Sequence, residues 1–321
     1  MNMNALTFSS FGDAEVLEYI EVPKPKIAKG EVLIQMKAIG LNFADIYRRK
    51  GHYHLKGEPP YIAGYEGAGQ VVESKSSQLN VGDKVAFADV PFANAEFVMA
   101  HEDHVIILED HVPYQLAASL LLQGMTAHYL CHDSHLIQPK EVVVIHAAAG
   151  GVGQLLLQMC KMRGATVIGL SRSAMKLEKI KELGADHALL LTDKWAQDVL
   201  HITEGEGVDV VYDSIGATLN DSIAVTKEKG TIVFYGMSGG DPAQVDPRVL
   251  MDGSKKLVGG DLWSYLKTSQ DRAFRAHRLF QWIFDAKLVV APPEVFELEE
   301  GEQAHEFLES GKSEGKVLLV P

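Results

Sequence analysis

The clearest pattern of apolar and polar positions lies between residues 142 and 170. Four β-branched residues, Val142–Ile145, form a short apolar run, which predicts a buried strand of a parallel sheet. Small residues follow, and apolar residues then recur at spacings of three and four from residue 152 to 162, which predicts an amphipathic helix. A second apolar run begins at Thr166, after Gly164. Strand, turn, helix and strand in this order predict a right-handed βαβ unit.

Helices and strands continue to alternate through the second half of the chain. Apolar runs at residues 208–212 and 231–235 predict two more strands. Helical spacing predicts further helices, at residues 126–135, 175–184, from about 220, and 270–286. Alternation of this kind is typical of a doubly wound α/β fold with a parallel sheet. We therefore expect a Rossmann dinucleotide-binding domain over residues 124–261.

The first 123 residues show a different pattern. Short apolar runs at residues 5–8, 31–36, 69–72 and 84–87 predict strands, separated by turn-forming residues. One stretch, residues 42–50, predicts a helix, and the last apolar run, residues 315–320, predicts a strand. Because the chain ends in β structure, we expect its end to return to the first domain. Residues 1–123 and 262–321 are thus predicted to form a mostly β domain, such as a distorted barrel.

Composition narrows the classes of protein to consider. At 321 residues, with 46% hydrophobic and 23% charged residues, the chain is long enough for two globular domains. Its net charge of −13 disfavours a nucleic-acid-binding surface. The two cysteines, Cys131 and Cys160, cannot form a disulfide framework or a four-cysteine zinc site. No apolar run approaches the roughly 20 residues that span a bilayer, and no leader pattern begins the chain. We expect a cytoplasmic protein without a membrane partner.

The turn after the strand at residues 142–145 carries candidate binding chemistry. Gly150, Gly151 and Val152 lead into a predicted helix, whose first N–H groups and dipole suit a pyrophosphate. Gly150 would let the main chain approach the phosphates, and Gly153 would let the helix pack closely on the strand. The pattern departs from the dinucleotide fingerprint at Ala148, where the first Gly is expected. The alternative is an ordinary tight turn between a strand and a helix.

The end of the next strand predicts the type of nicotinamide cofactor. An acidic residue about 20 positions past the glycines binds the ribose 2′-hydroxyl in NAD-preferring domains. Here that region contains Ser171, Arg172 and Lys176 and no acidic residue. A hydroxyl and two cations suit a 2′-phosphate, which Arg172 can bind bidentately, so we expect NADPH. The alternative is that both cations are solvated groups at the start of the next helix.

Four runs in the chain resemble those of a known family. They are GLNFADIYRR at residues 40–49, AGYEGAG at 63–69, QGMTA at 123–127 and AGGVGQ at 149–154. Collinear over essentially the whole chain, they are similar to the quinone oxidoreductase (zeta-crystallin-like) branch of the medium-chain dehydrogenase/reductase superfamily. The resemblance implies a GroES-like fold for the mostly β catalytic domain, beside the Rossmann domain.

Zinc-dependent members of this superfamily bind the catalytic metal with a Cys and a His from the first two runs. Here the first run has no Cys, and Tyr65 stands where the His would be. His52 and His54 form an H-x-H pair, but no Cys or acidic cluster completes a ligand set, and loop histidines of this kind are most often surface residues. We therefore expect no bound metal, and no metal-dependent alcohol oxidation.

The resemblance also implies which residues form the active site. It places Asn42 near the nicotinamide ribose, Tyr47 and Tyr53 at the substrate cleft, and Thr126 at the nicotinamide carboxamide. Each tyrosine could donate its hydroxyl proton to the reduced oxygen or serve only in packing. Further cofactor contacts are expected from Tyr235, Gly236 and Ser238 at a strand end, and from Lys316 to a phosphate. A Tyr that the family often has near the 2′-phosphate is missing from residues 188–192.

These observations predict an NADPH-dependent, zinc-independent oxidoreductase that reduces a quinone or an α,β-unsaturated carbonyl. Such acceptors need only hydrogen-bond donors to stabilise the reduced oxygen. A reductase of 2-alkenals or enoyl thioesters would share every motif. A non-catalytic NADPH- or RNA-binding protein of the zeta-crystallin type is the alternative outside enzymes, although the net charge of −13 disfavours RNA. An open sheet edge near residues 255–260 and the family resemblance predict a homodimer.

Overall fold

The computed structural model describes all residues from 1 to 321, and the chain forms two compact units. Unit 1 contains Met1–Leu122, Leu266–Gln281 and Val290–Pro321, and unit 2 contains Gln123–Tyr265 and Trp282–Val289. The chain therefore returns to the first unit near its end, and the short segment 282–289 belongs to unit 2. No helix is both long and apolar enough to cross a lipid bilayer.

Unit 2 is built on a six-stranded sheet in which every neighbouring pair is parallel. Its order, β11-β10-β9-β12-β13-β14, confirms the doubly wound Rossmann fold, with the reversal of strand order between β9 and β12. The strands are rich in β-branched residues and mostly buried on both faces, as a covered parallel sheet requires. Their bounds are β9 (Val142–Ile145), β10 (Thr166–Ser171), β11 (His187–Leu190), β12 (Val208–Asp213), β13 (Thr226–Phe234) and β14 (Lys256–Gly259).

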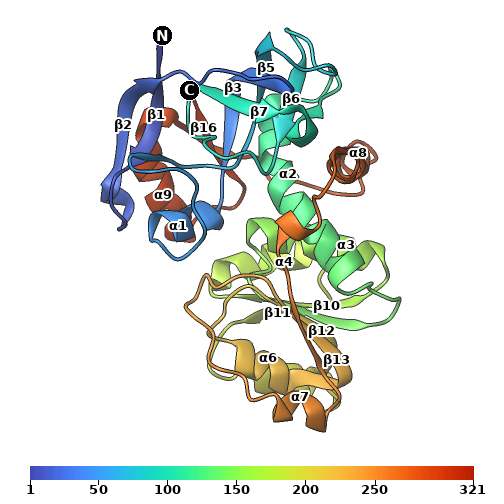
Figure 1. Ribbon diagram of the computed structural model, residues 1–321. Helices are drawn as coiled ribbons and strands as arrows, with labels where there is room; N and C mark the ends of the chain where they lie inside the picture. Colours follow the sequence, from blue (N-terminus) through green and yellow to red (C-terminus); the bar gives the residue numbers. More distant parts are fainter. The chain divides into compact units, whose positions relative to one another are not determined.

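Helices cover both faces of this sheet, with α3 and α4 on one side and α6 and α7 on the other (Figure 1). On the side of α5 and α6, a buried cluster joins Val144, Ile168 and Val211 of the strands to Trp195 and Val199 of α5. The bounds are α3 (Gly151–Met162), α4 (Leu177–Glu182), α5 (Trp195–Ile202), α6 (Leu219–Val225) and α7 (Arg248–Asp252), with short helical turns η3 (Leu130–Ser134), η4 (Ala174–Lys176) and η5 (Leu262–Ser264).

One helix begins much earlier than the sequence pattern predicts. A helix is expected from residue 126, but α2 runs over Tyr114–Tyr129 and continues into the π-helical turn η3. The first turns of α2 are apolar on nearly every side, since residues 117–121 are all buried, and so they show no helical periodicity. Gly124 also suggests a helix boundary, yet it lies inside α2. The sequence pattern therefore fails to predict the start of α2, because its first turns are buried on all sides.

Unit 1 confirms the mostly β, GroES-like expectation. Its larger sheet has the order β15-β16-β3-β5-β6-β8, with β7 also paired to β3, and a smaller sheet has the order β2-β1-β4. A buried cluster that includes Leu6, Ile34, Val71 and Phe87 fills the space between them. The strands are β1 (Asn2–Phe8), β2 (Leu17–Pro23), β3 (Glu31–Leu41), β4 (Tyr61–Ile62), β5 (Glu66–Ser74), β6 (Lys84–Phe87), β7 (Phe97–His101), β8 (Ile106–Ile107), β15 (Glu294–Glu297) and β16 (Val317–Val320).

The helices of unit 1 lie at the periphery of these sheets (Figure 1). They are α1 (Phe43–Arg49) and α9 (Gly301–Glu309), with the short turns η1 (Ala14–Val16), η2 (Glu102–His104) and η6 (Leu298–Glu300). Two further helices, α2 and α8 (Ser269–Phe284), start in unit 1 and end in unit 2. β16 pairs antiparallel with β3, which brings the end of the chain beside the start of α1.

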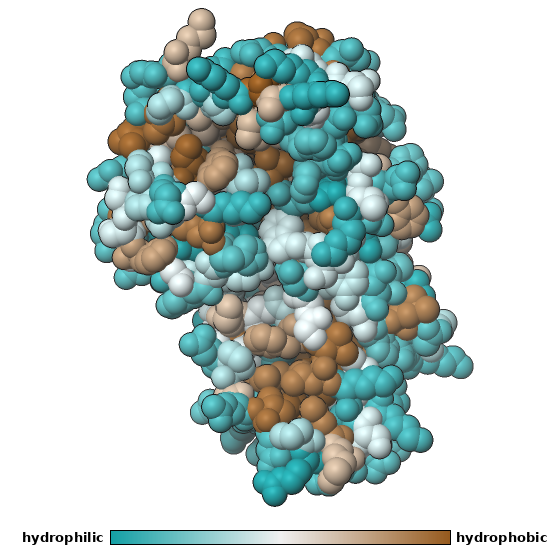
Figure 2. Space-filling model, in the orientation of Figure 1, coloured by the Kyte–Doolittle hydropathy of each residue, from teal (hydrophilic) through white to brown (hydrophobic).

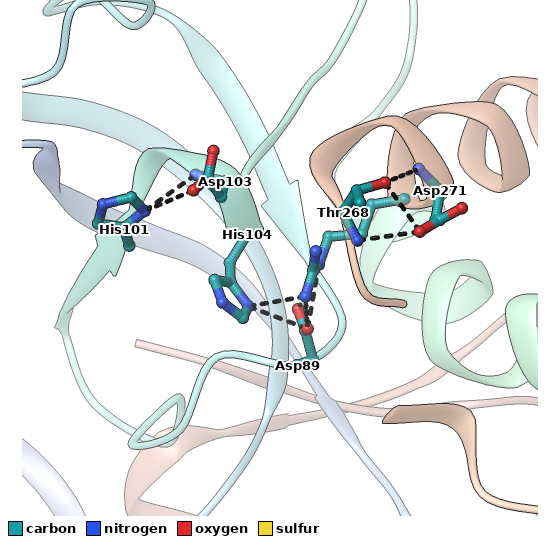
Figure 3. A network of polar contacts seen from close by, with 7 residues as sticks. Asp89, His101, Asp103, His104, Thr268 and Asp271 are labelled. Carbon is teal, nitrogen blue, oxygen red and sulfur yellow. Dashed lines mark hydrogen bonds and ion pairs between the residues drawn. The ribbon is translucent and has the colours of Figure 1, made fainter. Parts of the chain in front are cut away.

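A polar network fastens the start of α8 to unit 1 (Figure 3). The Thr268 N–H and hydroxyl donate to the Asp271 carboxylate at 2.9 and 2.8 Å and so close the first turn of the helix. One turn along, the buried Arg272 guanidinium donates to Asp89, which also contacts His104 Nδ1 at 2.9 Å. Burial alone would raise the pKa of Asp89, but hydrogen bonds from His104 and Arg272 outweigh it and hold the pKa below its ordinary value. Asp89 is therefore ionised where it holds α8.

Candidate functional site

The glycine turn of unit 2 forms the first part of the candidate site. β9 ends at Ile145, and α3 begins at Gly151 with Gly150 as its N-cap. The first backbone hydrogen bond of the helix runs from the Gln154 N–H to the Gly150 carbonyl at 2.9 Å. The N–H groups of Gly151, Val152 and Gly153 are therefore not needed by the helix itself. Amides of this kind, with the helix dipole behind them, form an anion-binding position.

Close contacts in the turn explain its glycines. A methyl group on Gly153 would lie 2.2 Å from the Ala147 carbonyl oxygen, so only Gly allows the helix to approach the strand. A methyl group on Gly151 would overlap the side-chain amide of Gln123 from α2. The left-handed position falls on Ala147, with φ +48°, and not on Ala148. This shift explains why the turn tolerates Ala148 where the fingerprint has its first Gly.

The predicted 2′-phosphate residues lie together at the end of β10. Ser171 is its last residue and is buried, and its hydroxyl accepts a hydrogen bond from the Ser173 N–H at 3.1 Å. Arg172 follows and is exposed, and Lys176, at the end of η4, is half-buried. No acidic side chain stands between residues 171 and 176. The end of this strand thus presents a hydroxyl and two cations, in one short segment.

The other predicted residues of unit 2 lie on two further elements. The loop after β13 contains Tyr235, Gly236 and Ser238, and all three are half-buried. The Ser238 N–H and hydroxyl donate to the Ser214 carbonyl at 3.0 and 3.1 Å, which ties this loop to the one after β12. Thr126 lies on α2 and is buried. The loops that follow β12 and β13 are therefore held together at the carboxyl edge of the sheet.

Unit 1 contains a buried charged cluster around Asn42. The Lys316 ammonium donates to the Asn42 side-chain oxygen at 2.6 Å and to the Glu66 carboxylate at 2.7 Å. The Asn42 amide nitrogen donates to the same carboxylate at 3.0 Å and to the Gly40 carbonyl at 3.1 Å. The other Glu66 oxygen accepts the Leu122 N–H at 2.7 Å. The Asn42 side chain is thus fixed from three directions.

This cluster gives Lys316 different partners from the predicted phosphate. Its side chain is 1% exposed, and both of the hydrogen bonds described for its ammonium stay within unit 1. The cause is the register of the last strand, in which Val317 is opposite Leu41 and so places Lys316 beside Asn42. Sequence inspection missed the role of Glu66 as the counter-ion of Lys316, because the two residues are 250 positions apart.

A second buried ion pair lies on α1. Asp45 caps the helix by accepting the Asn42 N–H at 3.0 Å, and its other oxygen accepts from the Arg48 guanidinium at 3.0 Å. Both side chains are 1% exposed, and burial raises the pKa of Asp45 above its ordinary value. The Arg48 guanidinium lies 3.7 Å from the centre of the Tyr65 ring and 5.1 Å from that of Tyr53. Asp45 therefore both caps α1 and orients Arg48.

The donor set around Tyr65 does not fit a zinc ion. A cation already lies against the Tyr65 ring, at the position where the zinc enzymes that the sequence resembles would have a histidine ligand. Both cysteines are buried in unit 2, where they pack in the core. Nowhere in the chain do three or more His, Cys, Asp or Glu side chains gather as a metal site.

The two candidate tyrosines lie on α1 and in the loop that follows it. Tyr47 is half-buried and packs near Phe43, with ring centres 6.4 Å apart. Tyr53 is half-buried as well, and its ring lies 4.0 Å from that of His54. The structure thus places Tyr53 next to Arg48. Tyr47 lies one helical turn from Phe43 on α1, the helix whose N-cap is Asn42.

Both halves of the chain match known family models. Residues 28–145 match the alcohol dehydrogenase GroES-like domain, and residues 151–275 match the zinc-binding dehydrogenase model. A 2-haloacrylate reductase from Burkholderia sp is 33% identical over 96% of each chain. The structure of a quinone oxidoreductase from Pseudomonas syringae pv. tomato is 33% identical, with a TM-score of 0.95 over 99% of this chain and all of that one.

A further solved structure shows a similar protein with its cofactor. The Escherichia coli quinone oxidoreductase complexed with NADPH is 31% identical and has a TM-score of 0.93. The match covers 99% of this chain and all of that chain. The similarity therefore extends over both units and includes the glycine turn and the α1 region.

Proposed function

We propose, since the chain belongs to the quinone oxidoreductase branch of the medium-chain dehydrogenase/reductase superfamily, that it is an NADPH-dependent reductase of quinones or α,β-unsaturated carbonyls. The observation that carries the proposal is the Arg48–Tyr65 contact, because it stands where zinc enzymes bind their metal. Without a Lewis acid, the acceptor must be one whose reduced oxygen hydrogen bonds alone can stabilise. Conjugated carbonyls and quinones meet that condition.

In this proposal NADPH, when bound, supplies the hydride. The N–H groups of Gly151 and Val152 bind its pyrophosphate, beside Gly150. Ser171, Arg172 and Lys176 bind the 2′-phosphate, with Arg172 free to form two parallel hydrogen bonds to it. Thr126 and the loop of Tyr235, Gly236 and Ser238 border the cofactor on the remaining sides. The NADPH bound to the Escherichia coli relative supports this assignment.

The acceptor side of the proposal rests on unit 1. Asn42 orients the nicotinamide ribose, and Lys316 with Glu66 holds the Asn42 amide in one rotamer. Lys316 thus acts through Asn42, and its contact with a phosphate stays a prediction. Tyr47 and Tyr53 donate a proton or a hydrogen bond to the oxygen of the acceptor as it is reduced. These roles divide the site residues into a cofactor set and an acceptor set.

We also propose that two copies of the chain pair through unit 2. Its edge strand β14 bonds to β13 on one side, which leaves the other side for a partner strand. Beside it, α7 exposes Val249 at 45% and Met251 at 70%. Figure 2 shows apolar side chains gathered on the visible surface of this unit. A second copy would cover both the strand edge and these side chains.

The buried free thiols of Cys131 and Cys160 suit a reducing cytoplasm.

Steady-state kinetics with NADPH test the proposed activity directly. The acceptors should include quinones, enones, 2-alkenals and enoyl thioesters, each at several concentrations. We expect the highest kcat/KM with a quinone or an enone. If kcat/KM is highest with an enoyl thioester, the acceptor class proposed here is wrong. If none of the compounds is reduced, the proposed enzymatic activity is contradicted. RNA binding that persists across a salt series would instead support the non-catalytic alternative.

A further inference from the structure

A buried polar network in unit 2 lies below the carboxyl edge of the sheet and has no part in the roles described above. His146 follows the last residue of β9 and is fully buried, as is Asp213, the last residue of β12. These two strands are neighbours, with Tyr212 opposite Ile145. They also flank the point at which the strand order reverses, where dinucleotides bind in folds of this type.

The hydrogen bonds of Asp213 hold the loop that follows β12. One carboxylate oxygen accepts the N–H groups of Ile215 and Gly216 at 2.9 and 3.1 Å. The other accepts the hydroxyls of Thr218 and Ser222 at 2.9 and 2.7 Å. Four donors therefore converge on one buried carboxylate, and the loop and the start of α6 are built around it.

The direction of these bonds fixes the protonation of His146. Ser222 has one hydroxyl proton, and its hydroxyl donates this single hydrogen bond to Asp213, because a carboxylate can only accept. The Ser222 oxygen, 3.1 Å from His146 Nε2, must then accept a hydrogen bond from the N–H of that nitrogen. In a neutral imidazole Nδ1 is then unprotonated, and here it is buried without a hydrogen-bond partner.

The surroundings of His146 keep the imidazole neutral. Burial lowers its pKa to about 4, against the opposing effect of Asp213 and Asp221. The imidazole and the Trp195 ring of α5 pack edge to face, with ring centres 4.8 Å apart. At neutral pH the side chain is thus a fixed, uncharged donor and not a proton carrier. A buried histidine with one unused nitrogen is an unusual choice for packing alone, where an apolar side chain would leave no polar atom unpaired.

We propose that His146 is a positioning residue for the dinucleotide. Through the Ser222 hydroxyl it joins the strand that enters the glycine turn to the carboxylate that holds the loop after β12. That loop in turn holds the segment of Gly236 and Ser238, through the bonds from Ser238 to Ser214. The network thus sets the spacing of two backbone segments between which the cofactor binds. This inference rests on the proposed cofactor site.

Direct titration of the full-length protein with NADPH and NADH, followed by fluorescence, tests the inference. Ser222→Ala and His146→Phe should each raise the Kd of both cofactors by about 5- to 50-fold. Because the network touches neither the 2′-phosphate residues nor the acceptor, the ratio of the two Kd values and the kcat at saturating NADPH should change less than about twofold. His146→Gln, whose amide can donate to Ser222, should restore the Kd to within about threefold of the wild type.

Thr203→Val is the matched control, because it removes a hydroxyl at the end of α5 that donates to the Val199 carbonyl at 3.0 Å and accepts the Gly207 N–H at 3.1 Å. It should lower the melting temperature without changing either Kd. If the variants of His146 and Ser222 have the same Kd for NADPH as Thr203→Val, the positioning role of His146 is overturned, while the proposed function is not affected. A wild-type protein that binds neither cofactor would overturn the proposed function as well. A long-range ¹H–¹⁵N spectrum should show His146 protonated on Nε2 only, and the opposite tautomer would contradict the network.

Discussion

Arg172 is the residue on which the choice of cofactor depends most. It is exposed at the end of β10, beside the Ser171 hydroxyl. Replacement by Ala removes one or two charge-assisted hydrogen bonds to a 2′-phosphate, and such bonds are worth about 1.5–3 kcal/mol. We expect Arg172→Ala to raise the Kd of NADPH by about 10- to 100-fold and to leave that of NADH nearly unchanged. Lys179→Ala, which removes a cation from α4, is the control. Equal Kd values of the wild type for the two cofactors would refute the assignment.

Tyr47 and Tyr53 are the residues that separate a chemical role from a packing role. If a hydroxyl stabilises the reduced oxygen mainly in the transition state, its removal lowers kcat more than it raises KM. We expect Tyr47→Phe or Tyr53→Phe to slow the turnover of an enone about 10-fold or more, because one such donor is worth about 2–4 kcal/mol at most. Quinones, which are easier to reduce, should be less affected.

Tyr61 provides the control for this pair, because its ring packs on Phe8 and Phe11 in the same unit. Tyr61→Phe should leave the kcat with both acceptors unchanged. If the double variant of Tyr47 and Tyr53 reduces enones at the wild-type rate while still binding NADPH, the two tyrosines serve only in packing. Catalysis would then depend on the position of the acceptor and on exclusion of water.

Removing one partner of the ion pair between Glu66 and Lys316 should strongly lower the free energy of unfolding. Their side chains are 0% and 1% exposed, so neither charge can be hydrated if the other is lost. Glu66→Gln should therefore lower the free energy of unfolding by about 3–5 kcal/mol, as measured by urea titration. Glu73→Gln, at an exposed carboxylate, should change it by less than about 1 kcal/mol. Lys316→Met added to Glu66→Gln should recover part of the loss, and two fully additive losses would show that the pair is not coupled.

At the scale of single elements, the sequence pattern predicts local structure best where one face or one period dominates. The strands β6 and β9 and the glycine turn have the predicted bounds, because apolar runs and turn residues mark both ends. The start of α2 could not be predicted, since its buried first turns carry no periodicity. Glu66 stood in a motif of the family, yet its partner Lys316 directly precedes the last strand, and only the register of β16 on β3 brings the two together.

The turn between β9 and α3 allows a test at this scale, because two of its glycines have different surroundings. Gly153→Ala places a methyl group 2.2 Å from a backbone oxygen, which forces α3 away from β9. We expect it to cost about 1–3 kcal/mol of stability and to abolish cofactor binding. At Gly150 the nearest atom would be 3.1 Å away and φ is −81°. Gly150→Ala should thus melt nearly as the wild type while binding NADPH more weakly, and equal destabilisation by both variants would contradict this account.

For the whole molecule, alternation of helices and strands and the change of pattern near residue 123 predict two parts with different folds. The structure has such parts, and the comparisons extend over both of them. The pattern could not show that residues 282–289 belong with unit 2, because α8 is a continuous amphipathic helix whose sequence has no break there. Such assignments depend on long-range packing, which local spacing does not record.

Assembly is the prediction that belongs to the molecule as a whole. If β14 and α7 form a two-fold interface, the pair of exposed apolar residues on α7 contributes to it from both copies. Combining Val249→Lys with Met251→Lys would then bury four cations in the interface, two from each copy, in an environment that excludes water. We expect light scattering to give a dimer for the wild type and a monomer for this double variant at micromolar concentrations. Met162→Lys, at an exposed Met of α3, should stay dimeric. A monomeric mass for the wild type over the same range would refute the interface.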